Sequence, residues 1–452
     1  MGQALVQTIR HFFPDLNTWL DCLPDARDQE SIIYERRFLA WWGIALYLFQ
    51  LSSRRQLDFE LDAAGTCVLT NLNRLADTDH DTRPVHDTLD YFLGHSRPEA
   101  LAALRMQMVQ RLIRMKALES ARLLGHLVVV VDGTGLLCWR RRHCDQCLTQ
   151  KHGDTTVYLH QVLEAKLLGP AGVVLSIGSE FIANADTKAT HGQNAEAVKQ
   201  DCELKAFSRL APRLKKAFPQ LQVVLAGDSL FACGRVLQLT ADYDWSYVLT
   251  FKQGHMPAVW AEFQRLLPLC PKNVLERTLP CGIQEEYRWV HDLSYEDDCR
   301  RRWHFTAIEC LVTPLVGEPT RFAWITKLPV SGKTVVDTAT KGGRNRWKIE
   351  NEGFNRQKNS GLNLEHVYST DPEKWQAYYH LLQIAFILVQ LLERGSLLRR
   401  LAEACGKTPM QLFGSLKNIA RRLLDSLRYS VWPDKSYDAR AAAALHIGLD
   451  TS

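Results

Sequence analysis

The sequence has no apolar stretch long enough to cross a lipid bilayer. Its longest one, Phe38–Phe49, lies between two arginine pairs and falls short of the roughly 20 residues that a spanning helix needs. The opening residues MGQALVQTIRHFF also lack the apolar core and cleavage site of a signal peptide. We therefore expect a cytoplasmic protein with reduced thiols and no membrane partner.

Glycine and proline are not in excess, with 26 and 17 residues in a chain of 452, and no internal repeat or low-complexity tract occurs. Apolar residues make up 46% of the chain and charged residues 23%. This composition argues against fibrous and disordered proteins. The length exceeds that of one compact core, so we expect about two to four domains.

The twelve cysteines are scattered, and only Cys144 and Cys147 lie close together. Their C-x-x-C spacing suits zinc, but a structural zinc site needs four ligands. His143, His152 and His160 are candidates to complete such a site, and none lies at a diagnostic spacing. A redox pair or simple packing are the alternatives, so the sequence alone does not establish zinc as a cofactor.

The formal net charge is only +5, but basic residues gather in two segments. The first contains Arg140, Arg141, Arg142, His143 and Lys151. The second surrounds Glu350 and Glu352 and contains Arg344, Arg346, Lys348, Arg356 and Lys358. Local basic patches attract phosphate backbones, although either segment alone is also typical of a solvated surface.

The pattern of apolar residues predicts an α/β centre between helical ends. Long helices are expected at 32–51, 98–124 and 375–392, and the chain between 126 and 251 alternates between branched runs and helical patterns. Strands are expected at 126–132, 157–168, 172–177, 222–228 and 245–251, and helices at 191–217 and 230–239. Three strands, a helix, a strand, a helix and a strand are the order of a ribonuclease-H-like (RNase H-like) mixed sheet with flanking helices.

These patterns divide the chain into five segments. A helical N-terminal region covers residues 1–120, and the first part of the core covers 121–251. A β-rich insertion follows at 252–340, where apolar and polar residues alternate and tryptophan is frequent. The second part of the core covers 341–396, and a helical, basic C-terminal region covers 397–452.

Three carboxylates occupy positions that suit metal-dependent phosphodiester chemistry. Asp132 and Asp228 each end a predicted buried strand, and Glu350 lies on a predicted helix. Two Mg²⁺ ions, roughly 3.5–4 Å apart, need several carboxylates that converge from different elements, and Mn²⁺ is expected to substitute. The alternative is that either aspartate, before Gly or Ser, is a turn residue or a helix cap.

The segment Arg346–Lys358, RWKIENEGFNRQK, resembles the signature helix of DDE transposases of bacterial insertion sequences. Asp132-Gly-Thr and Gly227-Asp228-Ser resemble the first and second acidic motifs of that family. The resemblance covers roughly residues 125–390. It implies an enzyme that cuts and joins DNA, a nucleoid-associated location in a bacterium, and Asp132, Asp228 and Glu350 as catalytic metal ligands.

The resemblance also implies DNA contacts along the signature helix, from Arg346, Lys348, Arg356 and Lys358. Arg346 is expected to contact phosphate or to orient Glu350, or else to form an ordinary i,i+4 ion pair with it. At the position where the family has a tyrosine, this sequence has Gly343. At the position of the family's lysine it has Gln357, one residue before Lys358. Lys358 could replace that lysine only through a local irregularity, since one residue is about 100° of helix.

Partners follow from the same resemblance. We expect double-stranded DNA, comprising the terminal inverted repeats and a target, bound by a homodimer. Residues 1–120 would bind the repeats, although no clear helix-turn-helix signature occurs there, and the C-terminal helices would pair two ends. An aromatic residue of the insertion would stack on a flipped base, for which Trp289, Trp303 and Trp324 are candidates, with core packing as the alternative.

Three other functions are consistent with parts of the sequence. The run Val-Val-Asp132-Gly-Thr-Gly resembles the phosphate loop of actin-like kinases, but the second loop and the duplicated halves of that class are absent. A transposase descendant retained only for DNA binding is the second alternative. An RNase H-type nuclease that hydrolyses without joining is the third, and Glu352, which should face away from Glu350, is a competing acid.

Overall fold

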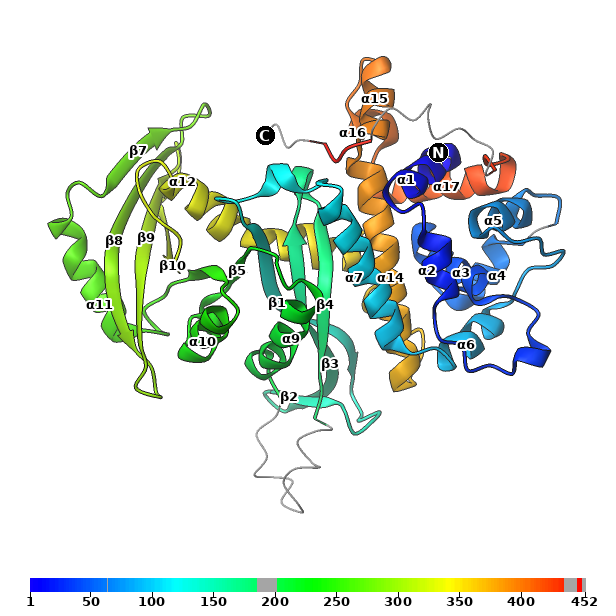
Figure 1. Ribbon diagram of the computed structural model, residues 1–452, viewed down its shortest axis with the longest axis horizontal. Coiled ribbons are helices and arrows are strands. Elements are labelled where there is room, and N and C mark those ends of the chain that lie inside the picture. Colours follow the sequence, from blue (N-terminus) through cyan, green and yellow to red (C-terminus); the bar gives the residue numbers. More distant parts are fainter. Residues whose placement is uncertain (63, 185–200, 435–444, 449–452) are drawn as a thin grey trace.

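The computed structural model describes residues 1–62, 64–184, 201–434 and 445–448. It shows a mixed α/β protein in which a long sheet adjoins a bundle of helices (Figure 1). In the described part of the chain the sheet has ten strands, in the order β2-β3-β1-β5-β6-β10-β9-β8-β7, with β4 paired to β3. The helical bundle lies at the β4 end and the antiparallel strands β7–β10 at the other.

Most of the strands expected from the sequence are present in the core. They are β1 (Leu127–Trp139), β2 (Leu148–His152), β3 (Thr155–Leu168), β4 (Val174–Ile182), β5 (Val223–Gly227) and β6 (Ser246–Thr250). β1, β3 and β4 are antiparallel neighbours, whereas β1, β5 and β6 are parallel. The short strand β2 was not expected from the sequence.

Two helices connect the parallel strands. They are α9 (Glu203–Ala217) and α10 (Gly234–Asp242), the latter preceded by a short 3-10 turn, Ser229–Phe231. Residues 191–200 of the expected helix lie outside the described residues. Apolar side chains of α9, among them Phe207 and Leu210, are buried, and the helix packs on β3 and β4.

The turn expected after Asp132 is wrong. β1 continues seven residues further, to Trp139, in a ladder with β3 that reaches Tyr158. The ladder holds Gly133, Thr134 and Gly135 extended and accommodates them with one irregularity between Gly135 and Leu137. Backbone pairing with a long neighbouring strand therefore outweighs the local turn preference of glycine.

The insertion is β-rich as expected, but it begins with a helix. After α11 (Pro257–Leu266) come β7 (Val274–Thr278), β8 (Gln284–Glu296), β9 (Arg302–Thr313) and β10 (Thr320–Thr326). β10 pairs antiparallel with β6, with Trp324 opposite Thr250. The insertion thus extends the core sheet instead of forming a separate one, and it ends beside the segment that carries Glu350.

That segment is helical but irregular. After α12 (Val335–Asp337) it comprises a π-helix at Thr338–Gly343, a 3-10 turn at Arg344–Trp347, a second π-helix at Ile349–Asn355 and α13 (Arg356–Asn359). Changes between 3-10 and π winding alter the angle between successive side chains. Positions on this segment therefore do not follow the 100° rule of a regular helix.

The N-terminal and C-terminal helices form one bundle. The N-terminal set is α1 (Gly2–Phe12), α2 (Leu16–Asp21), α3 (Arg36–Leu48), α4 (Arg54–Glu60), α5 (Val68–Ala76), α6 (His86–Gly94) and α7 (Pro98–Arg114). The C-terminal set is α14 (Pro372–Arg394), α15 (Ser396–Ala404), α16 (Pro409–Phe413) and α17 (Leu416–Tyr429). The long expected helices correspond to α3, α7 and α14.

Contacts between the two sets are specific. The buried Asn71 side chain of α5 donates to the carbonyls of Leu427 and Ser430, each at 2.7 Å, and Arg428 pairs with Glu60. α14 is buried along nearly its whole length and contacts α3 and α7. The segments 1–120 and 397–452 are therefore packed together, and residues 435–444 and 449–452 of the latter lie outside the described residues.

None of the helices in the described ranges combines the length and apolar content needed to cross a bilayer.

Candidate active site

The register of two parallel strands brings Asp132 and Asp228 together. On β1 and β5, Val130 lies opposite Ala226, and the same offset of the register places Asp132 opposite Asp228, directly after the end of β5. Neighbouring strands are about 4.7–4.9 Å apart. The apolar runs that precede both aspartates are buried, so two carboxylates lie at one place on the sheet because their strands pair in this register.

Glu350 approaches from the second π-helix and is exposed. Burial raises the pKa of Asp132, the cation of Arg346 opposes this shift, and the charges of Asp228 and Glu350 add to it. The three acids are thus close enough to interact electrostatically. Mutually repelling carboxylates in a half-buried site favour the binding of a compensating cation.

Asp228 also caps the short turn that follows it. Its Oδ1 accepts a hydrogen bond of 2.9 Å from the Leu230 amide. The alternative considered from the sequence, that this aspartate is a cap, therefore describes its geometry in part. Capping occupies one carboxylate oxygen and fixes the orientation of the other, which suits a ligand role as well.

Glu203 is a fourth acid at this place, and sequence analysis did not identify it. It is the first residue of α9, and a Cβ at Gly133 would overlap its carboxylate. Burial, followed by the charges of Asp132 and Asp228, raises the pKa of Glu203 to about 7. A helix N-terminus alone would lower the pKa, so burial and repulsion dominate here.

Arg346 pairs with Asp132 at 3.2 Å, between Nη1 and Oδ2. This pairing differs from the i,i+4 ion pair with Glu350 that regular helical spacing allowed. Arg346 belongs to the 3-10 turn and Glu350 to the π-helix that follows. Because the winding changes between them, Arg346 is free to reach across to β1.

The other basic residues of the signature segment are placed differently. Arg356 pairs with Glu393 at 2.5 Å and has only 12% of its side chain exposed, and Lys358 pairs with Glu365 at 2.9 Å. Lys348 is half-buried. The expectation that Arg356 is a DNA contact does not fit this burial, because its guanidinium stabilises the junction with α14.

Glu352 also lies toward α14, where Arg394 approaches its carboxylate to 3.2 Å. It is therefore turned away from the Asp132–Asp228 pair, as its two-residue separation from Glu350 suggested. A further ion pair with Arg356, at 3.7 Å, holds it there.

The position expected for the lysine of the family is occupied by a buried glutamine with a lysine beside it. Lys166 of β3 is fully buried and donates to Gln357 Oε1 at 3.1 Å. Its ammonium lies 4.4 Å from the centre of the Phe354 ring. Burial lowers the pKa of Lys166 to about 8, while the charges of Glu164 and Glu350 oppose the shift and that of Arg105 adds to it. An ammonium from a different element thus interacts with the charge of Glu350.

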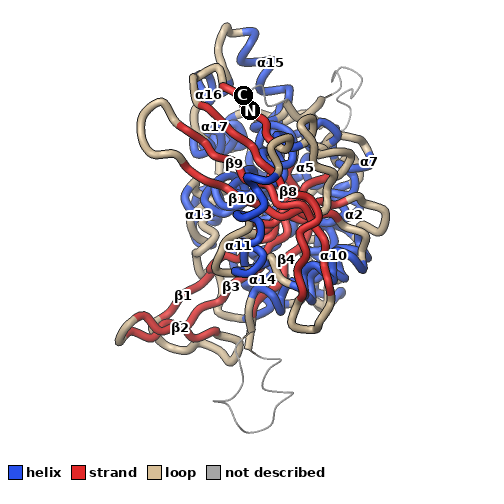
Figure 2. Tube along the Cα trace, turned by 90° about the vertical axis from the view of Figure 1, so that its left-hand side faces the viewer, coloured by secondary structure: helices blue, strands red, loops and turns tan. Residues whose placement is uncertain are grey.

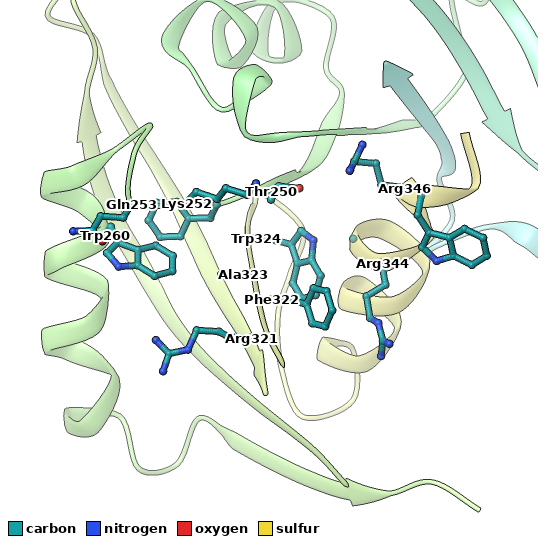
Figure 3. A pocket seen from close by; sticks show the side chains of 13 residues that line it. Thr250, Lys252, Gln253, Trp260, Arg321, Phe322, Ala323, Trp324, Arg344 and Arg346 are labelled. Atoms are coloured by element: carbon teal, nitrogen blue, oxygen red, sulfur yellow. The ribbon is translucent and has the colours of Figure 1, made fainter. Parts of the chain in front are cut away.

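A pocket of about 610 Å³ adjoins Arg346 and extends toward the insertion (Figure 3). Aromatic and basic side chains from the segment after β6, from α11, from β10 and from the Arg344–Trp347 turn line it. They include Lys252, Trp260, Arg321, Phe322, Trp324, Arg344, Arg346 and Trp347. Trp347 is 46% exposed, whereas a Cβ at Gly343 would overlap the buried Trp324 indole, so this packing leaves no room for a tyrosine at position 343.

Of the three candidate tryptophans, only Trp324 lines this pocket, and it is 3% exposed. Trp289 is equally buried and donates to His291 at 3.1 Å. Trp303 donates to Asp297 at 3.0 Å. Trp289 therefore has the packing role considered as the alternative, whereas Trp303 is half-buried and lies outside this pocket. The exposed ring of the pocket, Trp347, was missed.

A tight group of metal-binding atoms occurs elsewhere in the described residues. Cys144, Cys147 and His160 offer donor atoms that all lie within 4.8 Å of one another, and no group containing the acids meets this criterion. The acids are therefore spaced more widely than the ligands of one preformed site.

The chain matches no protein-family model and no curated protein sequence.

Proposed function

We propose that this protein is a DNA transposase of the DDE type, which cuts and joins DNA strands by two-metal-ion phosphoryl transfer. The observation that carries this proposal is the electrostatic interaction of Asp132 with the acids Asp228 and Glu350 and its ion pair with Arg346, at 3.2 Å. Such acids from separate elements are the donors that Mg²⁺ or Mn²⁺ requires.

The order of elements supports the proposal. β1, β3 and β4 are followed by α9, β5, α10 and β6, which is the order expected of an RNase H-like core. The insertion then returns the chain to the sheet edge beside β6. Glu350 thereby approaches the carboxyl ends of parallel strands, the side of an open α/β sheet on which ligands bind.

The residues fit the metal ions by the chemistry of their donors. Asp132, Asp228 and Glu350 would hold two Mg²⁺, and Glu203 adds a carboxylate that is already against β1. When bound, the ions would activate the attacking oxygen and stabilise the leaving oxygen. Asp228, fixed by its bond to the Leu230 amide, would hold its free oxygen in place without loss of side-chain entropy.

Two displacements at phosphorus make up the proposed reaction. Water attacks a phosphodiester at the element end, a P–O bond breaks, and a 3′-hydroxyl is released. That hydroxyl then attacks a second phosphodiester and displaces another 3′-oxygen, so bonds are exchanged without an external energy source. Arg346, which lines the aromatic pocket, would contact a phosphate oxygen in both steps.

The pocket beside Arg346 suits an unpaired nucleotide at the cleaved end. Arg321 and Arg344 would attract its phosphate, while Trp347 offers an exposed ring for base stacking. Basic residues combined with an accessible ring are the usual features of single-strand binding.

We propose that double-stranded ends and target DNA are the partners, bound by a homodimer.

Strand cleavage tests this function directly. A supercoiled plasmid carrying the element's own ends is incubated with Mg²⁺ or Mn²⁺ and with wild type or Asp132→Asn. Wild type should nick and join, whereas the variant should bind the ends without cutting. Cleavage without joined products would favour a nuclease, and binding without cleavage by both proteins would favour a DNA-binding relic.

A further inference from the structure

Three donor atoms meet where β1, β2 and β3 end. Cys144 Sγ lies 3.6 Å from Cys147 Sγ and 3.4 Å from His160 Nε2, and Cys147 Sγ lies 3.6 Å from the same nitrogen. The two cysteines flank the turn before β2, whereas His160 belongs to β3. Residues from a loop and a neighbouring strand therefore form one triangle.

The triangle has the dimensions of one face of a zinc tetrahedron. Zn–S bonds of about 2.3 Å and a Zn–N bond of about 2.0–2.1 Å, at tetrahedral angles, place the two sulfurs about 3.8 Å apart and each sulfur about 3.6 Å from the nitrogen. The three observed separations agree with these values within about 0.2 Å. We propose that Cys144, Cys147 and His160 bind a structural Zn²⁺.

The surroundings hold the ligands in place. Cys147 is fully buried and His160 is 3% exposed. The His160 ring packs between Trp139, at 5.4 Å between centroids, and Trp375, at 5.1 Å. Because the imidazole is confined by two tryptophans, zinc would bind without a change in its position.

The donor types distinguish this site from the carboxylate site. Thiolate and imidazole select zinc over Mg²⁺, which prefers carboxylate and water. The nearest further candidate along the chain is His143, which is exposed, adjacent to Cys144 and tilted against Trp139 at 4.7 Å between ring centroids. His143 after a side-chain rotation, or a water molecule, completes the tetrahedron.

The zinc site anchors the first basic segment. Arg140, Arg141, Arg142 and Lys151 are exposed, and the ends of β1, β2 and β3 extend from the body of the molecule (Figure 2). A metal that ties the 140–147 loop to β3 fixes these charges relative to the sheet. That this rigid basic tip contacts phosphate backbones rests on the proposed function, whereas zinc binding does not.

Metal analysis of the full chain tests the site. Wild type purified without chelator should hold one equivalent of zinc, and Co²⁺ added to zinc-free protein should give the intense tetrahedral bands of thiolate coordination. Cys147→Ser and His160→Gln should lose both signals, while Cys138→Ser, which removes an exposed thiol of β1, should keep them.

Two results would overturn the proposal. One is wild type that holds no zinc and gives no thiolate–cobalt bands under reducing conditions; the other is equal metal content in Cys147→Ser. Because zinc-free wild type is itself measured, the test does not depend on the folding of a variant. DNA is absent from these measurements, so a failed zinc site and a failed transposase proposal are distinguishable.

His143→Ala identifies the fourth ligand in the same assay. A large loss of zinc affinity would assign the position to His143, and near-normal affinity would assign it to water.

DNA binding at low salt then tests the role of the loop. Zinc removal should weaken DNA binding by wild type but leave DNA binding by the already zinc-free Cys147→Ser unchanged. Equal effects of chelator on both proteins would contradict the anchoring role.

Discussion

The Arg346 guanidinium lies 3.2 Å from the Asp132 carboxylate, although 214 residues separate the two along the chain. Asp132 is also repelled by Asp228 and Glu350. Arg346 therefore neutralises part of the negative charge that a metal ion would neutralise. We infer that cation and arginine compete for Asp132, and that metal binding releases Arg346 toward the pocket.

Arg346→Ala should consequently raise the affinity for Mn²⁺ in the absence of DNA. We expect about a two- to fivefold gain at low salt, the scale of a partly exposed ion pair worth up to ~1 kcal/mol. Isothermal titration measures this. Arg344→Ala is the control, because Arg344 lines the same pocket but pairs with Glu285 at 2.7 Å. Unchanged or weaker Mn²⁺ binding by Arg346→Ala would contradict the competition.

Glu350 and Glu352 form a matched pair for testing the third ligand. Glu350→Gln should reduce cleavage by about 100-fold or more, because loss of a metal ligand removes several kcal/mol of transition-state stabilisation, while DNA affinity is retained. Glu352→Gln should keep cleavage and lose some thermal stability, since Glu352 pairs with Arg394 and Arg356. The reverse pattern of cleavage rates would assign the ligand to Glu352.

Gly133 and Gly135 provide a second matched pair, on one strand. A methyl group at Gly133 would overlap the Glu203 carboxylate, whereas nothing lies within 4 Å of a Cβ at Gly135. Gly133→Ala should weaken Mn²⁺ affinity by about tenfold, the lower end for a disturbed outer ligand shell. Gly135→Ala should bind Mn²⁺ like wild type. Equal affinities of the two variants would show that Glu203 is not part of the site.

The sequence predicted the parts of the core that depend on local pattern. Branched runs before Asp132 and Asp228 indicated buried strands, and β1 and β5 confirm them. The parallel register that joins the two aspartates could not be read from either run alone, because it depends on pairing across about a hundred residues. The continuation of β1 through Gly133 was missed because it depends on pairing with β3.

The rest of the site depends on packing. Glu203 reaches β1 only because α9 packs on β3 and β4, and no motif surrounds it. Arg346 reaches β1 because a 3-10 turn precedes a π-helix. This change of winding has no sequence signature. His160 joins Cys144 and Cys147 because the β2–β3 ladder pairs Leu148, next to Cys147, with Leu159, next to His160, which the C-x-x-C spacing could not indicate.

Glu203 should make stability fall as the pH rises. Its folded pKa is raised from 4.5 to about 7, so the folded chain binds more protons than the unfolded chain between these values, and the free energy of unfolding decreases across that window. In EDTA, the melting temperature of Glu203→Gln should therefore exceed that of wild type by more at pH 8 than at pH 5.

Differential scanning fluorimetry measures these melting temperatures. Glu99→Gln is the control, because it also replaces a first-turn glutamate, on α7, away from the other acids. Addition of Mg²⁺ at pH 8 should raise the melting temperature of wild type more than that of Glu203→Gln. A constant difference between the two proteins at both pH values would contradict the assigned environment of Glu203.

Trp347 should carry the base stacking in the Arg346 pocket, because Trp289 is buried and Trp303 does not line the pocket. Its ring is 46% exposed at the edge of the Arg346 pocket, and base–aromatic stacking contributes about 1–3 kcal/mol. Trp347→Ala should therefore weaken binding of ends with an unpaired terminal nucleotide by about tenfold, but bind fully paired ends like wild type. Phe59→Ala, which removes a ring that is 79% exposed in the helical bundle, should bind both like wild type. If Trp347→Ala weakened the binding of both kinds of ends equally, the ring would contact duplex DNA instead, and the pocket would have no role in holding an unpaired base.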